Sequence, residues 1–282
     1  MISLILATVG RTSELGRLFE SFAAQTFKEF EVIIVDQNTD DRLLPFVERA
    51  KQLGLDVKYL KHYPANLAAA RNKGIEAAAS NWIGFPDDDC WYDPDVLEHI
   101  ARHITKPEAP DGVIIRWVEQ GEPPVVAPCL SWERSRNFRD VPVSSITLFI
   151  KRSTLAAIGG FDSRFGVGQW FGAAEEHDLV LRALREGANL AYEPAAEVHH
   201  AVGPKEAPAD PQARLAARKR ARGTGALYAK HSLPVWVIAR GLLAPILRPL
   251  MKGSLGNELA YGLAVVRGRL DGMIGWNRRQ HH

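Results

Sequence analysis

Residues 81–92 read NWIGFPDDDCWY. An apolar run at 82–85 has the pattern of a buried strand and leads into three consecutive carboxylates, Asp87, Asp88 and Asp89, with no basic residue beside them. Carboxylates packed this closely repel one another unless a cation lies among them. Oxygen ligands suit Mg²⁺ or Mn²⁺, which take further ligands from a substrate's phosphates. The stretch therefore indicates either a metal site for a phosphorylated substrate or a solvated acidic turn before a helix near Asp93.

The first hundred residues alternate short apolar runs with amphipathic stretches, which is typical of a parallel sheet covered by helices. We expect strands at 2–7, 31–36, 56–60 and 81–86, and helices at 13–25, 41–53 and 67–79. Sites in such open sheets lie beyond the carboxyl ends of the strands. Residues 8–11, residues 36–38 and the aspartate triplet all follow predicted strands, so we expect them to share one edge of the sheet.

The middle of the chain is less regular. We expect strands at 112–118, 145–150 and 189–192, and helices at 153–158 and 174–186. Residues 166–172 have the composition of a flexible loop with exposed aromatic side chains. The helix after this loop opens with Glu175, Glu176 and Asp178. Acidic residues in a first turn interact favourably with the helix dipole, by about 0.3–1 kcal/mol each, which is a structural explanation for these three.

Length and composition are those of a globular protein. The 282 residues, 46% apolar and 24% charged, suit one large domain or one domain with an appendage. Only two cysteines occur, without metal-site spacing, so we expect a reducing compartment and no disulfide framework. The chain starts with a strand-like run that lacks a basic n-region, so we expect no signal peptide.

The charge is unevenly distributed along the chain. Residues 205–282 hold 14 Lys/Arg against four Asp/Glu, although the whole chain has a net charge of only +2. We expect a catalytic domain at 1–204 and a helical region at 205–282, with helices at 211–230, 233–251 and 257–270. Such a basic region predicts contact with an anionic surface.

Residues 233–251 approach the length of a membrane span, but they contain two arginines and two prolines. A basic amphipathic helix lying in the membrane interface fits better, and packing on the catalytic body is the alternative. Nucleic-acid binding would favour Lys/Arg interleaved with stacking aromatics. The large side chains here are mostly aliphatic, so we expect lipid and no nucleic acid.

A series of motifs resembles the inverting glycosyltransferases of family 2, which have a GT-A fold. The matching stretches lie at 3–11, 31–41, 66–74, 85–95, 159–162 and 171–182, so the resemblance covers about residues 1–200. It implies an α/β fold of the GT-A type, a Rossmann-like and mostly parallel sheet flanked by helices. The basic amphipathic helices at the C-terminus are an appendage to that fold.

The resemblance also implies a nucleotide-sugar donor site. The residues matched to it are Thr8, Arg11, Asp36, Arg71, Asp87 and Asp88. Asp87 is expected near the ribose, and Asp89 is expected to bind the Mg²⁺ or Mn²⁺ that bridges the diphosphate, with His199 or His200 as a further contact. A surface arginine on a helix is the alternative for Arg71. Gln37 stands where the family usually has a second aspartate, so the nucleotide base stays open.

Sugar transfer places charge on a departing nucleoside diphosphate, which a divalent ion stabilises, and the acceptor hydroxyl needs a general base. The resemblance assigns the base to Glu176, with Glu175 as the alternative. Acceptor contacts are expected from Trp170 and Phe171 in the aromatic loop, and from Asp178, for which orienting or capping the helix is the alternative.

We therefore predict a metal-dependent inverting glycosyltransferase that moves a sugar to a hydroxyl of a glycan, expected to be lipid-linked, in cell-surface polysaccharide or glycoconjugate synthesis. The expected location is cytoplasmic, peripheral on the inner face of the cell membrane. The alternatives are a non-catalytic nucleotide-sugar-binding relative and a nucleotidyltransferase. A nucleotidyltransferase needs a glycine-rich phosphate loop after the first strand, and residues 9–12 are too short and too poor in glycine for one.

Overall fold

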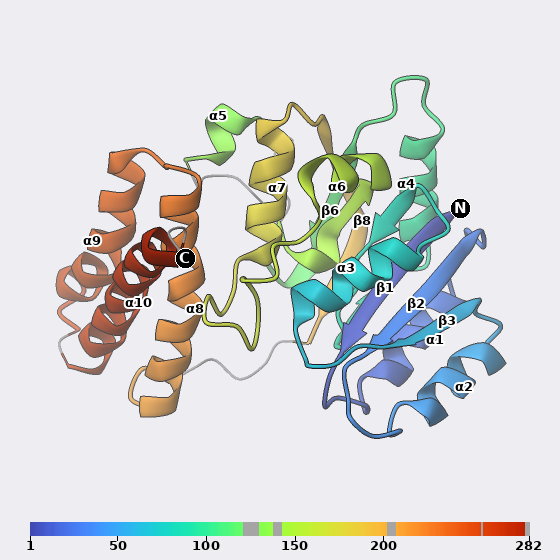
Figure 1. The fold of residues 1–282 in the computed structure, drawn as a ribbon, viewed down its shortest axis with the longest axis horizontal. Coiled ribbons are helices and arrows are strands. Elements are labelled where there is room, and N and C mark those ends of the chain that lie inside the picture. The colour runs from blue at the N-terminus through green and yellow to red at the C-terminus, as the bar shows by residue number, and fades with distance from the viewer. Residues whose placement is uncertain (121–129, 138–142, 202–206, 255, 280–282) are drawn as a thin grey trace.

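The computed structural model describes residues 1–120, 130–137, 143–201, 207–254 and 256–279. The described part forms an α/β body around one sheet, with a layer of C-terminal helices beside it (Figure 1). The domain boundary expected after residue 204 lies outside the described residues.

The sheet has a parallel half and a mixed half. Its parallel half contains β1 (Ile2–Thr8), β2 (Phe30–Asp36), β3 (Val57–Lys61) and β4 (Trp82–Gly84), in the order β3-β2-β1-β4. Beyond β4 it continues through β7 (Leu148–Lys151), β6 (Gly112–Trp117), β8 (Leu190–His200) and β5 (Cys90–Tyr92). β7 runs antiparallel to both of its neighbours and β5 runs antiparallel to β8, whereas β6 and β8 are parallel.

Helices cover both faces of the sheet. One face packs against α1 (Leu15–Ala23), α2 (Leu44–Gln52) and α4 (Val96–Ile104). The other packs against α3 (Leu67–Ala77), α6 (Arg152–Ile158) and α7 (Glu175–Arg185). Every residue of β1 and β2 is buried. This explains why these strands are nearly continuous apolar runs instead of alternating ones.

The sequence-based prediction failed at two places in the mixed half. The strand expected at 189–192 extends to His200 as β8, and residues directly after the aspartate triplet form β5, which pairs Cys90 with His200. The strand expected at 145–150 begins instead with a turn of 3₁₀-helix, Ser145–Thr147, before β7. The Ser144 N–H donates to Thr147 Oγ1 at 3.1 Å, so a local capping interaction replaces the sheet there.

Three helices form the C-terminal layer: α8 (Pro211–Lys230), α9 (Val235–Met251) and α10 (Asn257–Arg279). The last extends well past the predicted end at Leu270. The backbones of α8 and α10 pack closely at two glycines of α10, which have no Cβ. A Cβ at Gly268 would lie 2.3 Å from the Arg218 carbonyl oxygen, and one at Gly272 would lie 2.1 Å from the Arg222 carbonyl oxygen. No helix in the described ranges has the length and apolar character needed to cross a membrane.

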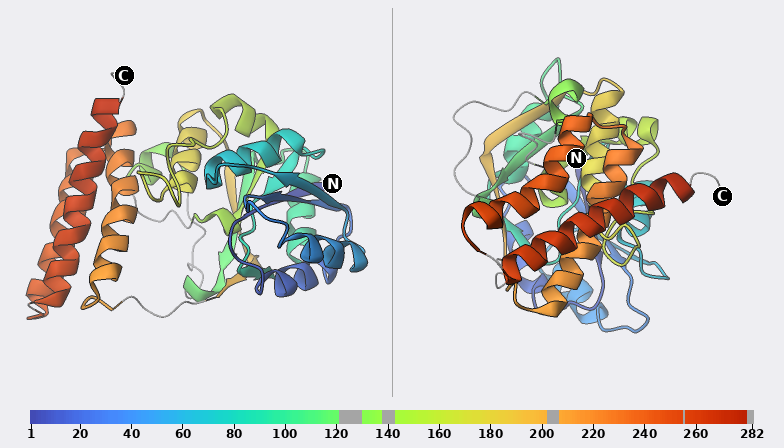
Figure 2. Two further views of the ribbon diagram at one scale, coloured as in Figure 1. Left: turned by 60° about the horizontal axis from the view of Figure 1, so that its bottom comes forward. Right: turned by 90° about the vertical axis from the view of Figure 1, so that its left-hand side faces the viewer.

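The layer stands on the α7 side of the body, and Figure 2 shows it from the side and face-on. An apolar cluster joins the two parts. Phe165, Phe171 and Ala174 of the body pack in it with Leu227 of α8 and Trp276 of α10. The short helix α5 (Trp132–Ser135) also contacts α7.

Candidate active site

The carboxyl ends of β1 and β4 meet at one edge of the sheet. Thr8 Oγ1, at the end of β1, donates to Asp88 Oδ2 at 2.6 Å, and Arg11 Nη1 lies 2.8 Å from Asp88 Oδ1. Arg11 also contacts the Asp89 carboxylate. The three aspartates line a cleft of about 430 Å³ together with Arg11 and His200. The structure therefore brings Thr8, Arg11 and the aspartate triplet together, as the sequence predicts.

Asp36, at the end of β2, lies fully buried beside this cleft. Its carboxylate accepts a hydrogen bond from Tyr59 at 2.6 Å and lies 2.9 Å from Lys61 Nζ. Burial alone would raise its pKa, but the bonds from Tyr59, Asn38 and Lys61 outweigh burial and lower the pKa. The neighbouring Gln37 is the side chain from this strand end that lines the cleft.

Arg71, on α3, connects two groups of carboxylates. Its side chain is 1% exposed, with Nη2 2.8 Å from Asp87 Oδ1 and Nη1 3.3 Å from Glu175 Oε1. Asp87 also accepts a weak hydrogen bond from Ser145 at 3.3 Å. Burial raises the pKa of Asp87, Arg71 opposes that effect, and the charges of Asp88 and Asp89 add to it. The alternative of a surface arginine is wrong, because this guanidinium is enclosed between two carboxylates.

Asp89 and His200 form a carboxylate–imidazole pair with 2.9 Å between Oδ1 and Nε2. The hydrogen bond to Asp89 raises the pKa of His200. Burial would raise the pKa of Asp89, but His200 and Arg11 outweigh it and lower that pKa. A carboxylate oxygen and an imidazole nitrogen are ligands that suit Mn²⁺. The residues present therefore fit a divalent ion, which would compete with Arg11 for Asp89.

His199 faces away from this pair, because successive residues of a strand point to opposite faces. Its ring stacks on Trp91, with 5.2 Å between centroids, and its nitrogens lie 3.1 Å from Asp93 and 3.3 Å from Glu119. Asp93, Glu197 and His199 place possible ligand atoms within 4.8 Å of one another, but an ion pair with Arg116 already engages Glu197. Of the two candidate histidines, only His200 reaches the aspartate triplet.

The acidic pair opens α7 from a left-handed backbone position. Ala174, which precedes the helix, has φ +82°. A non-glycine residue in this region is strained by roughly 1–2 kcal/mol. Burial and the charge of Glu176 raise the pKa of Glu175 to about 7. Burial would also raise the pKa of Glu176, but the hydrogen bond from His177, at 3.3 Å, outweighs it and lowers that pKa.

The expectation that the aromatic loop is exposed is corrected. In the loop at 166–172, Phe171 is fully buried against the C-terminal helices. Trp170 is half-buried beside the Arg222 guanidinium, 4.9 Å from the ring centroid. The composition indicated an exposed loop because it contains nothing that shows the C-terminal helices covering it.

Asp178 is also fully buried, so it does not face the cleft. Its Oδ1 lies 2.7 Å from Lys230 Nζ and 2.9 Å from His231 Nε2, at the end of α8, and its Oδ2 binds Arg182. The structure therefore favours a positioning role for Asp178, where α7 meets the C-terminal layer.

Sequence reasoning missed several residues that hold the site. Asn66 caps α3 by accepting from the Ala69 N–H at 3.0 Å, and its own N–H donates to Gln37 at 2.7 Å. An asparagine before a helical run is a readable capping signal. Ser145 and Lys61 gave no such signal, because they reach Asp87 and Asp36 only through the fold.

Solved glycosyltransferases share this architecture. A mannosyltransferase from Pyrobaculum calidifontis, in complex with GDP-Man and Mn²⁺, has a TM-score of 0.64 over 98% of this chain and 87% of its own, at 16% identity. TarS 1–349 of S. aureus, in complex with UDP-GlcNAc, has a TM-score of 0.60 over 95% of this chain and 92% of its own, at 18% identity. This likeness establishes the class of the fold, which is the GT-A fold of glycosyltransferases.

Residues 3–158, more than half of the chain, match the family model described as Glycosyl transferase family 2. The chain therefore belongs to glycosyl transferase family 2. A putative glycosyltransferase, EpsH of Bacillus subtilis, is 31% identical over 121 residues, which is 43% of this chain and 35% of the relative. A pre-mycofactocin glycosyltransferase of Mycobacterium tuberculosis is 28% identical over 292 residues, 95% of this chain and 56% of the relative. The chain thus spans about half or less of the length of these curated relatives.

Proposed function

We propose that this protein is a metal-dependent inverting glycosyltransferase. It transfers a sugar from a nucleoside diphosphate donor to a hydroxyl of an acceptor glycan. Arg71 carries the proposal, because one buried guanidinium contacts both Asp87 and Glu175. The acidic pair therefore lies one side chain away from the aspartate triplet, close enough for both to act on one bound sugar.

The donor side of the site contains Thr8, Arg11, Asp36, Arg71, Asp87 and Asp88. Gln37 and the three aspartates line the cleft in which we place the nucleotide. Asp89 and His200 would hold Mg²⁺ or Mn²⁺. When bound, the ion supplies positive charge to the departing diphosphate. Two structural neighbours bind GDP-Man and UDP-GlcNAc, so both bases occur within this fold, and Gln37 leaves the base open here.

On the acceptor side, we assign the general base to Glu176 and a supporting role to Glu175. The lowered pKa of Glu176 keeps its carboxylate ionised at neutral pH. In the transfer, Glu176 takes the proton of the acceptor hydroxyl as its oxygen forms a bond to the anomeric carbon. The bond from that carbon to the diphosphate oxygen breaks on the opposite face, and the nucleoside diphosphate leaves with the electron pair.

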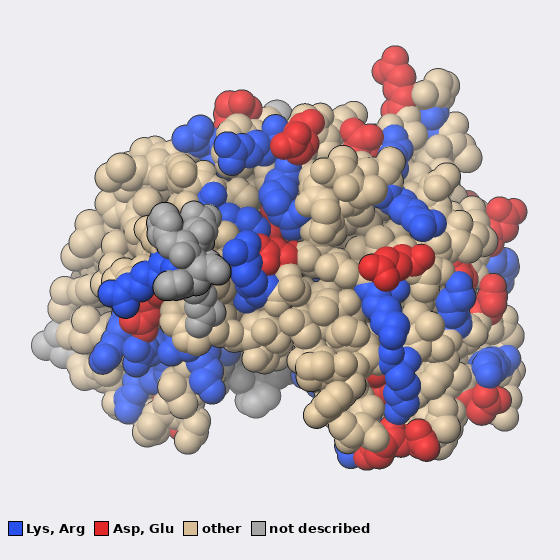
Figure 3. All heavy atoms as spheres, viewed as in Figure 1, with Lys and Arg blue, Asp and Glu red and all other residues tan. Residues whose placement is uncertain are grey.

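We further propose that residues 205–282 hold the enzyme on an anionic membrane surface, at the inner face of the cell membrane. The large apolar side chains Trp236, Leu243 and Leu247 are exposed on α9. Figure 3 shows Lys and Arg side chains gathered over part of the C-terminal layer, with few Asp or Glu among them. A lipid-linked glycan of a cell-surface polymer or glycoconjugate is the acceptor that suits this location.

The first experiment is thermal unfolding with UDP-, GDP-, dTDP- and CMP-sugars, each with and without Mn²⁺. We expect one nucleotide to raise the Tm, and to do so only with the metal. Asp89→Asn should lose most of this metal-dependent shift, because it removes an anionic ligand. A Tm that no donor changes in the presence of Mn²⁺ would contradict the proposed donor site.

A further inference from the structure

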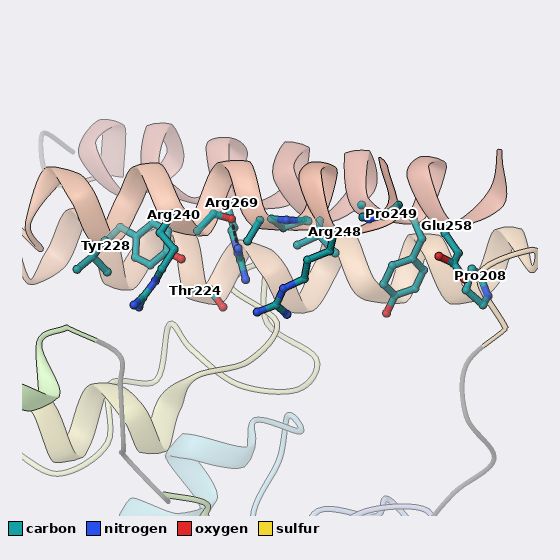
Figure 4. A pocket seen from close by; sticks show the side chains of 15 residues that line it. Pro208, Thr224, Tyr228, Arg240, Arg248, Pro249, Glu258 and Arg269 are labelled. Carbon is teal, nitrogen blue, oxygen red and sulfur yellow. Dashed lines mark hydrogen bonds between the residues drawn. The ribbon is translucent and has the colours of Figure 1, made fainter. Parts of the chain in front are cut away.

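A second cavity, separate from the donor cleft, lies within the C-terminal layer. It has a volume of about 600 Å³ and is lined by residues of α8, α9 and α10. Figure 4 shows Arg240, Arg248 and Arg269 along it, with Tyr228 and Thr224 nearby. We call it the arginine pocket.

The lining of the arginine pocket has an excess of positive charge. It includes three arginines and one carboxylate, Glu258. Arg269 is already engaged, because it donates to the Gly241 carbonyl oxygen. That carbonyl lacks its usual helical partner, since Pro245 has no N–H to donate.

The other two arginines are available to an anion. Arg240 gives one hydrogen bond to the Asn137 carbonyl oxygen, at 2.7 Å, and keeps further N–H groups. Arg248 is exposed, and its guanidinium makes no hydrogen bond or ion pair with another residue that the structure describes. The two lie eight residues apart on α9, about 12 Å along the axis, on neighbouring stripes of the helix. Each guanidinium has a planar set of N–H donors that matches the oxygens of a phosphate.

Part of the remaining lining of the pocket is apolar. Val237 and Ala244 of α9 and Val265 of α10 line it. The helical period places Trp236, Leu243 and Leu247, all exposed, on a stripe of α9 beside Arg240. Phosphate-binding groups next to an apolar stripe fit an amphiphile with an anionic head better than a free anion.

We infer that the arginine pocket binds the phosphate of an anionic lipid, and that this lipid is the carrier of the acceptor glycan. The inference deepens the proposed function and rests on it for the identity of the acceptor. The position of the pocket supports it. Thr224 of α8 lines the pocket, and the adjacent Gly223 packs on the Ala173 carbonyl, one residue before Ala174 and the acidic pair. α8 therefore contacts both the pocket and the loop that presents Glu175 and Glu176.

The test measures binding without turnover. The chain of residues 1–282 is titrated with dihexanoyl phosphatidic acid below its micelle concentration. Dihexanoyl phosphatidylcholine and inorganic phosphate are titrated in parallel. We expect phosphatidic acid to bind, phosphatidylcholine to bind at least about tenfold more weakly, and inorganic phosphate not to compete at equal concentration. Arg248→Gln should weaken phosphatidic acid binding about tenfold or more, the usual effect of losing one charge-assisted hydrogen bond.

Arg267→Gln is the matched control, because it removes the same charge from an exposed position of α10 that does not line the pocket. It should bind phosphatidic acid as the wild type does. Equal loss in both variants would overturn the inference, as would equal binding of phosphatidylcholine or full competition by inorganic phosphate. The nucleotide-sugar Tm shift, measured on the same samples, tests the transferase proposal independently, and Arg248→Gln should leave that shift unchanged.

Discussion

At the scale of single residues, the site depends on one buried cation shared between two acidic groups. Arg71 is 1% exposed, so bulk solvent does not reach its guanidinium. Removing one partner of a buried ion pair typically destabilises a protein by about 3–5 kcal/mol. The two glutamates of the acidic pair also have different partners, since Glu175 contacts Arg71 and Glu176 contacts His177.

This difference predicts which glutamate is the base. Glu176→Gln should lower the rate of sugar transfer by about 10²-fold or more, because the amide cannot accept the proton. The donor-induced Tm shift should stay as in the wild type. Transfer rates and donor binding are measured on the same preparation. Wild-type transfer by Glu176→Gln, together with loss of transfer in Glu175→Gln, would move the base to Glu175.

The raised pKa of Glu175 predicts a pH-dependent stability. Its pKa lies at about 7 in the folded protein against an ordinary 4.5, so the folded state binds this proton more tightly than the unfolded chain does. The contribution is fully present below pH 4.5 and is lost as pH rises through 7, in total about 3 kcal/mol.

The matched variant is Glu175→Gln, which keeps a neutral side chain at every pH. Urea unfolding at pH 5.5 and 8.5 should show the wild type losing more stability than the variant between these two values. The same pH dependence in both proteins would show that Glu175 does not carry the effect.

At the scale of elements, close backbone contacts fix the positions of the C-terminal helices relative to the body and to one another. A Cβ at Gly223 of α8 would lie 2.0 Å from the Ala173 carbonyl oxygen. In α9, Pro249 leaves the Pro245 carbonyl without a helical partner, and a Cβ at Gly262 of α10 would lie 2.0 Å from that oxygen. Each carbonyl group that a proline of α9 leaves without a helical partner therefore lies against α10, one beside Gly262 and the other accepting from Arg269. These contacts explain how α9 tolerates its two prolines.

Gly223→Ala should therefore destabilise the protein and lower transfer without touching substrate, because it pushes α8 away from the loop before Glu175. We expect a loss of about 1–3 kcal/mol, typical of overpacking. The control is Gly16→Ala in α1, where a Cβ meets nothing within 4 Å. It should be neutral or gain up to about 1 kcal/mol from helix propensity. Equal unfolding free energies for the two variants would contradict the close contact.

At the scale of the whole molecule, the body and the C-terminal layer share one apolar cluster and one ionic cluster. Trp276 of α10 is 2% exposed and packs on Phe165 and Phe171, 5.5 Å from each ring centroid. Asp178 binds Lys230 and His231 beside it. We therefore expect the two parts to unfold together, although the sequence suggests a boundary near residue 204.

Trp276→Ala should lower the Tm of a single unfolding transition, with a loss of about 3–5 kcal/mol. Trp236→Ala, at a position 47% exposed on α9, should change stability by less than about 1 kcal/mol. Calorimetry shows whether the body and the C-terminal layer unfold in one transition or in two. Two separate transitions, only one of them shifted by Trp276→Ala, would show that the layer folds independently.

The sequence by itself determined the parallel half of the sheet, the convergence of Thr8 and Arg11 on the aspartate triplet, and the family. The sheet and the convergence follow from hydrophobic periodicity and from where the strands end, which are local properties. The family follows from the resemblance of short motifs to those of known glycosyltransferases. It also placed Glu175 and Glu176 at the start of a helix, because that helix has a clear amphipathic pattern.

Only the tertiary structure decided that Arg71 joins Asp87 to Glu175, because Arg71 and Glu175 are 104 positions apart in the chain. It also decided that His200, and not His199, faces Asp89, because the pairing of β8 with β5 sets the side to which each points. The burial of Phe171 and Asp178 depends on α8 and α10, which follow them in the chain. Burial is a property of what packs against a residue, and no local pattern around residues 166–178 contains that information.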